Sequence, residues 1–402
     1  MNARERWLQT LLFGTPDKIP LQAGHGREST WRRWHQEGLP EGTVAINEYA
    51  YRQAGGTQPW PHGGIELGSW GVNPGCYPGD VDNDYFFEVD SRMVPQFEEK
   101  VVEQREGSRI VQDWKGNICE ISNEYTVEYL RGGIDFVTRR WIKCPVESRD
   151  DWEEMKSRYD PEEPSRFPEE AQRLGQRLSE RDWPVEIVLP GPFWQLRDWL
   201  GFESLCMMLH DDPDFVLEML RFWEEFIARL LEKTFSYVIP DSIHINEDMA
   251  YKSFSMISPD MTREFLFPAW SRWGKIVREA GCPLYAIDSD GYIGELIPIW
   301  IEAGFNLCGP VEVAAGNDLV DFRRRFGGKM AYRGGVDKRA IAAGGKSIRD
   351  EIKRLEPVVR DGGFIPGCDH GLPHDISWSN YVDYVKLLAQ ASGWGHQSRR
   401  TP

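Results

Sequence analysis

The sequence has no CxxC pair, and its seven cysteines are an odd number without regular spacing. Closed structural zinc sites are usually built from closely spaced Cys and His pairs, so a zinc finger or ribbon is not expected. An odd and irregular set also argues against a disulfide framework. We therefore expect a protein of the reducing cytoplasm.

Two further deficits exclude other classes of protein. No uninterrupted apolar run approaches the ~18 residues that a membrane-spanning helix needs, and residues 1–7 hold no apolar signal core. Basic residues are in deficit, with 47 Lys and Arg against 64 Asp and Glu, a net charge of −17. Phosphate binding needs the opposite balance, so we expect neither a nucleic-acid nor a membrane partner.

The chain does contain the material for a large core. Its 402 residues, 41% hydrophobic and 28% charged, suit one large α/β domain or two ordinary ones. Seventeen tryptophans are many for this length. Most must lie in the core, but they leave ample material for an aromatic-lined pocket that takes a small-molecule substrate.

The most informative stretch is 283–291, where five apolar residues lead into Asp288 and Asp290 and then a glycine. A run this short and apolar predicts a strand buried on both faces, and a helical pattern follows it at 293–301. The two aspartates have the same parity and should point to one side. They form a metal site, an acid/base site or, as the plainer alternative, caps of the next helix.

The pattern predicts a TIM (β/α)8 barrel as a single domain over residues 1–402. A helix over 2–13 opens with a capping box of Asn2 and Glu5, and another covers 212–235. One or two βα units near 18–50, added to six in the C-terminal part, give about the eight units of a closed barrel. An open doubly wound sheet is the alternative, weakened by the lack of GxGxxG after the first strand. Six strands are expected in the C-terminal part: 186–190, 242–248, 283–290, 306–313, 330–336 and 363–370.

Residues 64–146 have a different pattern, and we expect an antiparallel β meander inserted into the barrel there. Lys115-Gly116-Asn117 and similar turns separate its short strands. Nothing in it points to catalysis, so it is at most a lid or a partner surface. The expected strands are 85–89, 100–103, 108–114, 118–121 and 136–139.

Polar residues gather where the barrel strands end, which in this fold is one shared mouth. Glu247, Asp290 and Cys368, together with His370, could supply oxygen, sulfur and nitrogen ligands to one zinc and leave a position open. Loops after buried strands also attract polar residues by chance, and a lone cysteine is more often a small buried apolar residue than a ligand.

Three segments of the chain resemble motifs of the uroporphyrinogen decarboxylase superfamily. The resemblance runs over nearly the whole chain. Gln22-Ala23-Gly24 with Arg27 is similar to its early substrate loop, 191–196 to its second Gly-Pro segment, and His370-Gly371 to its late His-Gly pair. The family comprises TIM-barrel tetrapyrrole decarboxylases and corrinoid-dependent methyltransferases. In place of the methyltransferases' His-x-Cys this chain has Asp288-Ser289-Asp290, while Cys368 stands near their late Cys.

The resemblance implies a corrinoid-dependent methyltransferase. It would move a methyl group from a small methylated compound, for which the tryptophans suggest a methoxylated aromatic, to cobalamin on a partner corrinoid protein. A zinc on Asp290 and Cys368, with Glu247 or Asp288, would polarise the ether oxygen. The expected site residues are His370, Asp248 and Asp288 for catalysis, Gln22, His25, Arg27, Phe193, Trp194 and Glu312 for substrate, and Glu247, Asp290 and Cys368 for metal.

Two alternatives stay open. The first is a metal-independent decarboxylase of a tetrapyrrole or other carboxylated compound, with Arg27 as anchor and His370 as proton donor. A mouth ringed by acids repels the several carboxylates of a tetrapyrrole, which disfavours it. The second is a barrel without catalysis that binds a ligand or partner. The oligomeric state is also open, a homodimer included.

Overall fold

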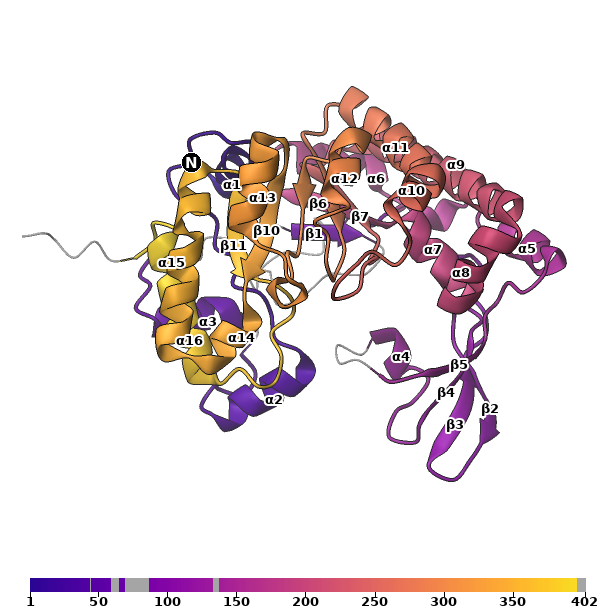
Figure 1. The fold of residues 1–402 in the computed structure, drawn as a ribbon, viewed down its shortest axis with the longest axis horizontal. Helices are drawn as coiled ribbons and strands as arrows, with labels where there is room; N and C mark the ends of the chain where they lie inside the picture. Colours follow the sequence, from indigo (N-terminus) through magenta and orange to yellow (C-terminus); the bar gives the residue numbers. More distant parts are fainter. Residues whose placement is uncertain (44, 59–64, 69–86, 133–136, 396–402) are drawn as a thin grey trace, which may run out of the picture.

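The computed structural model describes residues 1–43, 45–58, 65–68, 87–132 and 137–395. Its main body is a seven-stranded sheet in the order β1-β6-β7-β8-β9-β10-β11, with every neighbouring pair parallel (Figure 1). The regular alternation of strands and helices expected after residue 185 is therefore confirmed. The strands are β1 (Ile65–Gly68), β6 (Val185–Pro190), β7 (Ser242–Asn246), β8 (Leu284–Asp288), β9 (Leu307–Cys308), β10 (Ala331–Val336) and β11 (Phe364–Cys368).

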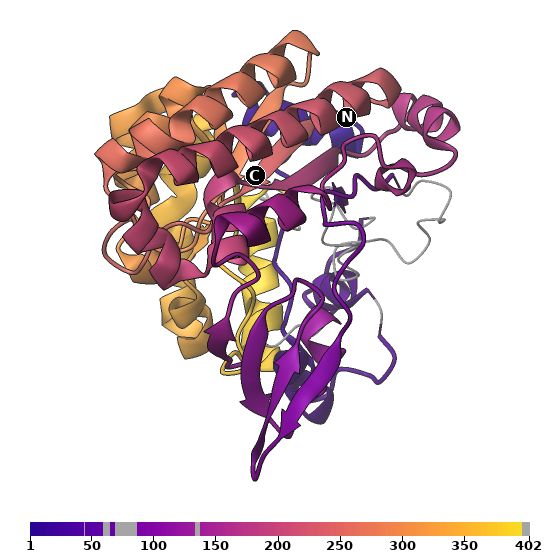
Figure 2. The ribbon, with the colours of Figure 1, turned by 90° about the vertical axis from the view of Figure 1, so that its right-hand side faces the viewer.

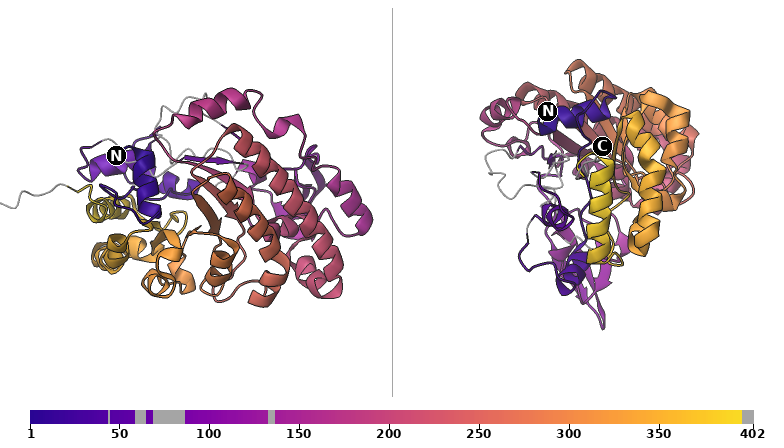
Figure 3. Two further views of the ribbon diagram at one scale, coloured as in Figure 1. Left: turned by 90° about the horizontal axis from the view of Figure 1, so that it is seen from above. Right: turned by 90° about the vertical axis from the view of Figure 1, so that its left-hand side faces the viewer.

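The helices that follow these strands lie along the outer side of the sheet in a curved row (Figure 3). No helix in the described ranges is long and apolar enough to cross a bilayer. The helices are α1 (Ala3–Leu11), α2 (Glu28–Gln36), α3 (Ile46–Gln53), α4 (Tyr129–Gly132), α5 (Arg149–Lys156), α6 (Ala171–Ser179), α7 (Pro192–Leu200), α8 (Phe202–Asp211), α9 (Pro213–Tyr237), α10 (Pro259–Met261), α11 (Phe267–Glu279), α12 (Ile297–Ala303), α13 (Leu319–Phe326), α14 (Lys338–Ala343), α15 (Gly345–Asp361) and α16 (Trp378–Ala391).

Helix α1 covers the amino-terminal end of the sheet's inner face. It begins with the expected capping box, in which Asn2 accepts from the backbone N–H of Glu5 and Glu5 accepts from that of Asn2. Its Trp7 packs in one buried cluster with Leu284 and Ala286 of β8. Because side chains alternate along a strand, Asp288 lies on this same face at the opposite, carboxyl-terminal end. The sheet's inner face therefore runs from an apolar floor to a polar rim.

The expected closed ring of eight strands is not found in the part of the chain that the structure describes. Edge strands β1 and β11 are not paired with each other there. Residues 22–26 lie beside β11, since Gly26 forms an isolated parallel bridge with Leu372, but they form no strand. Pro20 has no N–H to give, and Gly24 has a φ of 88°, outside the extended region. The strand expected after Lys18 is therefore wrong.

The antiparallel sheet is shorter than expected and stands apart from the parallel sheet (Figures 1 and 2). It consists of β2 (Lys100–Gln104), β3 (Ser108–Gln112), β4 (Ile118–Ser122) and β5 (Arg140–Lys143). The expected start near residue 64 is wrong, because β1 pairs with β6. Residues 87–89 and 137–139 form no strand, and positions 85, 86 and 136 lie outside the described residues.

Candidate functional site

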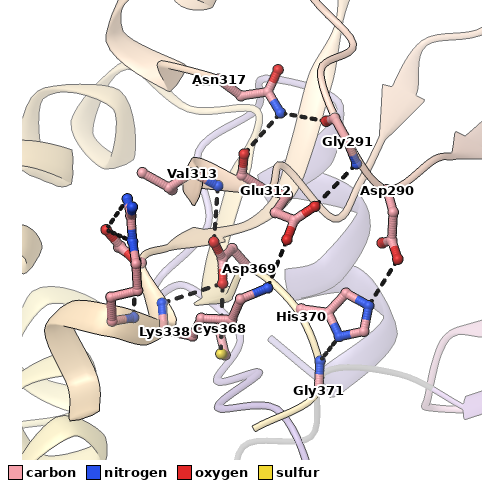
Figure 4. A network of polar contacts seen from close by, with 12 residues as sticks. Asp290, Gly291, Glu312, Val313, Asn317, Lys338, Cys368, Asp369, His370 and Gly371 are labelled. Atoms are coloured by element: carbon pink, nitrogen blue, oxygen red, sulfur yellow. Dashed lines mark hydrogen bonds and ion pairs between the residues drawn. The ribbon is translucent and has the colours of Figure 1, made fainter. Parts of the chain in front are cut away.

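The centre of the candidate site is a hydrogen-bonded pair, Asp290 and His370, which lie just beyond β8 and β11 (Figure 4). Asp290 Oδ2 lies 2.9 Å from His370 Nε2, and the side chains are 40% and 20% exposed. The hydrogen bond and charge of Asp290 raise the pKa of His370 against the effect of burial. Two groups 80 residues apart thus form one partly accessible acid/base unit, as the shared mouth required.

The second ring nitrogen of His370 defines the tautomer. The backbone N–H of Gly371 donates to Nδ1 at 2.7 Å, so Nδ1 acts there as an acceptor and the proton sits on Nε2, facing Asp290. This is the neutral ring. An additional proton would bind at Nδ1 and make the ring positively charged. Asp290, at Nε2, favours the charged ring, whereas the Gly371 N–H, at Nδ1, favours the neutral ring.

Replacing Asp290 by asparagine is expected to lower the pKa of His370, because the carboxylate that stabilises the imidazolium is lost. Side-chain 15N NMR of the wild type and Asp290→Asn, with the signal assigned by its absence in His370→Asn, measures this pKa. Asp321→Asn, which removes a carboxylate paired with Arg324 on α13, is the matched control and should leave it unchanged. An unaltered pKa in Asp290→Asn would mean that the pair is not coupled in solution.

Asp248 and Asp288 add two more carboxylates on the same side. Asp248 Oδ2 accepts from Arg197 Nη2 at 3.2 Å, and its backbone has a φ of 42°, a region that residues other than glycine rarely adopt. Burial raises the pKa of both groups, that of Asp288 to about 7, and the charge of Asp290 adds to the effect. A carboxyl group whose pKa lies near neutral, as that of Asp288 does, is a candidate proton carrier.

A second polar cluster lies beside the pair (Figure 4). Lys338 Nζ donates to Glu312 Oε1 at 2.7 Å, and Glu312 Oε2 accepts from the backbone N–H of Gly291. Buried Asp369 accepts from the backbone N–H groups of Val313 and Lys338. Glu312 thereby fixes the turn that carries Asp290, so its predicted substrate-binding role is joined by a structural one.

The early loop reaches the same place. The charge of His370 acts on His25, whose pKa is lowered mainly by burial, and the charge of Arg27 acts on Asp290 and His370. The carbonyl of Gln22 lies so close to Gly367 that a Cβ there would meet it at 2.4 Å. The loop is therefore packed against β11, and His25 and Arg27 lie close enough to the pair for charges to act between them.

The carboxyl group of Glu247, a predicted metal ligand, accepts hydrogen bonds from three N–H donors. Oε1 accepts from the Trp270 indole at 2.6 Å, and Oε2 from the backbone N–H groups of Phe193 and Trp194 at 3.0 and 3.1 Å. A Cβ on Gly191 would lie 2.1 Å from its carboxyl carbon. Burial raises the pKa of Glu247 to about 8, and the three donors oppose that rise. This carboxyl ties β7 to the start of α7.

The predicted zinc ligands are not brought together. Across the described residues, no group of three or more His, Cys, Asp and Glu side chains is arranged to hold a metal ion. Glu247 is held by its three donors and Asp290 by His370. Burial, with the charge of Asp369, raises the pKa of the Cys368 thiol. Among the described residues, the donor set therefore does not fit zinc.

Of the two predicted aromatic residues, only one is accessible. Phe193 is buried in the main core with 1% exposure, so its side chain serves packing. Trp194 lines a cavity next to α7, described below.

A charged network that joins three strands on the inner face of the parallel sheet was not predicted from the sequence. Arg333 of β10 contacts Glu186 of β6 at 2.8 Å and His244 of β7 at 2.9 Å. Arg333 and His244 overcome burial and hold the pKa of Glu186 below its ordinary value. The signal was present in the sequence: Ser242-Ile-His244-Ile-Asn246 alternates polar and apolar, which places the polar residues on the face of Asp288.

Comparisons with known proteins bear on the fold. No protein-family model matches the chain, and no curated protein does. A solved methyltransferase from Methanosarcina mazei is similar with a TM-score of 0.54 and 13% identity over 98% of both chains. A B12-independent methionine synthase from Shewanella sp. W3-18-1, in complex with selenomethionine, has a TM-score of 0.35 and 14% identity over 56% of this chain and 65% of that one, too low to carry an argument. The first likeness supports a TIM-barrel-like α/β fold.

Proposed function

We propose that this protein is a methyltransferase of the uroporphyrinogen decarboxylase superfamily that moves a methyl group from a small methylated compound to a corrinoid on a partner protein. The observation that carries the proposal is the Asp290–His370 pair at the strand ends, a unit suited to protonating a leaving group. The fold likeness to a methyltransferase over nearly the whole chain supports the class of reaction.

The protein's part in this reaction is proton transfer and positioning. When bound, the corrinoid supplies the nucleophile for the methyl carbon. The bond between that carbon and the donor's oxygen breaks, and its electron pair stays on the oxygen. Charged His370 gives the oxygen its Nδ1 proton and returns to the neutral tautomer in which the Gly371 N–H occupies Nδ1. Asp290 holds Nε2 throughout and so keeps the ring in place.

A methoxylated aromatic remains the proposed donor. The charges of Arg27 and Lys338 act on the pair, which supports the proposal that they stabilise a developing phenolate. Acid catalysis by His370 takes the role that zinc was expected to fill.

The test is methyl transfer from a panel of methoxyarenes to cob(I)alamin, followed by the absorbance change on methylation and by chromatography of the phenol. We expect methylcobalamin and phenol in equal amounts with at least one donor. A homogeneous preparation, assayed with and without added divalent metal and inactive on the whole panel, would contradict the proposal.

Metal-independent decarboxylation is the second candidate, and the cations near the pair are what favour it. Arg27 could anchor a carboxylate, while His370 protonates the carbon that keeps the electron pair when the carbon–carbon bond breaks. Release of 13CO2 from a labelled carboxylated substrate, without any methyl transfer, would favour this reaction over the first.

A further inference from the structure

A cavity of about 390 Å³ lies between the antiparallel sheet and α7, outside the Asp290–His370 pair. The turn between β3 and β4 contributes Trp114 and Lys115, α4 contributes Arg131, and α7 contributes Trp194 and Asp198. In the view of Figure 1 the antiparallel sheet lies below α7 and α8. This volume suits a small organic ligand. The inserted sheet therefore builds part of a pocket wall.

The walls of this cavity are aromatic and cationic. Lys115 Nζ lies 5.9 Å from the ring centre of Trp114 and 6.0 Å from that of Trp194, so both indoles share one ammonium group. The Arg131 guanidinium lies 5.0 Å from the Trp114 ring. An aromatic ring has room for offset stacking on such indoles, and its negative substituent would meet the cations.

One buried hydroxyl in the cavity has no protein partner. Ser91 is 1% exposed, lines the cavity, and its Oγ has no hydrogen-bond partner in the described part of the chain. Leaving a buried hydroxyl without a hydrogen bond is unfavourable, because the group has lost its contacts with water. A ligand that accepts or donates one hydrogen bond at this point would remove that cost.

The charged residues of the lining are of both signs. Among the described residues, three cations (Arg92, Lys115, Arg131) and two acids (Glu88, Asp198) line the cavity. Arg92 pairs with Asp90 and Glu88, and Arg131 pairs with Glu99, so a bound carboxylate would share these cations with the protein's own acids. Burial raises the pKa of Glu88 against the opposing charge of Arg92. Lys115 already pairs with Asp198 at 2.5 Å, so a bound carboxylate would compete with Asp198 for the ammonium group.

We propose that this cavity is a binding site for small aromatic carboxylates, with the ring against Trp114 and Trp194, the carboxylate at Lys115 and Arg131, and a hydrogen bond from Ser91. The inserted sheet is then a ligand-recognition element. The inference goes beyond methyl transfer, because binding is measured on the resting protein and holds whether or not the ligand is the methyl donor.

Isothermal titration calorimetry of the full chain with four probes tests the chemistry of the site. Benzoate and 2-naphthoate should bind. Cyclohexanecarboxylate, which lacks the ring, and benzylamine, which reverses the charge, should bind at least tenfold more weakly. No measurable binding of the two aromatic carboxylates, or benzylamine binding as tightly as benzoate, overturns the proposal.

Variants locate the site by effects of opposite sign. Lys115→Gln should weaken 2-naphthoate binding at least tenfold, whereas Asp198→Asn should strengthen it, because the ammonium group loses its competitor. Ser91→Ala should weaken binding severalfold without lowering the melting temperature, since the hydroxyl has no protein partner. Lys346→Gln on α15, 81% exposed, is the control and should change nothing. Unchanged affinity in both Lys115→Gln and Ser91→Ala would put the ligand elsewhere and overturn the proposal.

Discussion

Replacing His370 by asparagine is expected to lower kcat for methyl transfer by roughly 10²–10⁴-fold, the contribution typical of a positioned general acid. Asparagine keeps a polar side chain of similar reach but has no proton to give at neutral pH. The donor's leaving oxygen must then take its proton from water. Because Arg27 and Lys338 remain, binding of the donor should change much less than kcat.

The control for this substitution is His210→Asn, an exposed histidine on α8. It should keep the wild-type rate, and both variants should keep the wild-type melting temperature. A His370→Asn variant that folds normally and turns over at the rate of His210→Asn would remove His370 from the reaction.

Replacing Glu247 by alanine is expected to lower the free energy of unfolding by about 3–5 kcal/mol, because buried donors lose their acceptor and a cavity is left in the core. The substitution leaves the Trp270 indole and the backbone N–H groups of Phe193 and Trp194 without their acceptor, and it opens a cavity between β7 and α7. Urea denaturation followed by far-UV circular dichroism measures the loss.

A double-mutant cycle separates the hydrogen bonds from packing. Glu247→Gln should cost about 1–3 kcal/mol, since its amide either faces the Trp270 N–H or leaves the other two donors short of an acceptor. Combining it with Trp270→Phe should recover part of that loss, because the competing donor is gone. If the two losses simply add, Glu247 and Trp270 are not coupled, and the indole hydrogen bond contributes nothing to stability.

The strand pattern predicted where the Asp290–His370 pair would lie. Asp290 and His370 were each expected at the end of a buried strand, and the structure joins them just beyond β8 and β11. This follows from the rule that the carboxyl ends of parallel strands share one rim. Asp290 lies outside β8, so alternation along the strand does not determine its direction.

The zinc prediction rested on residue types, which do not show whether a donor atom is already hydrogen-bonded. Glu247, Asp290 and Cys368 have suitable donor atoms, yet which donors are already engaged depends on neighbours distant in sequence. Trp270 lies 23 residues from Glu247 and His370 lies 80 from Asp290. Hydrogen-bond partners at such separations leave no periodic signal in the chain.

The strand predicted after Lys18 does not form, and the reason is local. The apolar residues after Lys18 suggest a strand, but Pro20 and Gly24 interrupt the hydrogen-bond ladder, and among residues 18–27 only Gly26 forms a bridge, to Leu372. In the inserted sheet, strands were recognisable from their turns, whereas the membership of Ile65–Gly68 in the parallel sheet depends on a pairing with residues 120 positions away.

The dependence of methyl-transfer rate on pH, measured in the wild type and in Asp290→Asn, tests most directly whether this pair supplies the proton. The carboxylate raises the pKa of His370, so the charged ring persists to higher pH, and the rate should fall as pH rises through that pKa. In Asp290→Asn the pKa drops and the fall should occur at lower pH. A fall at the same pH in both proteins, or a rate that rises with pH across this range, would contradict the account.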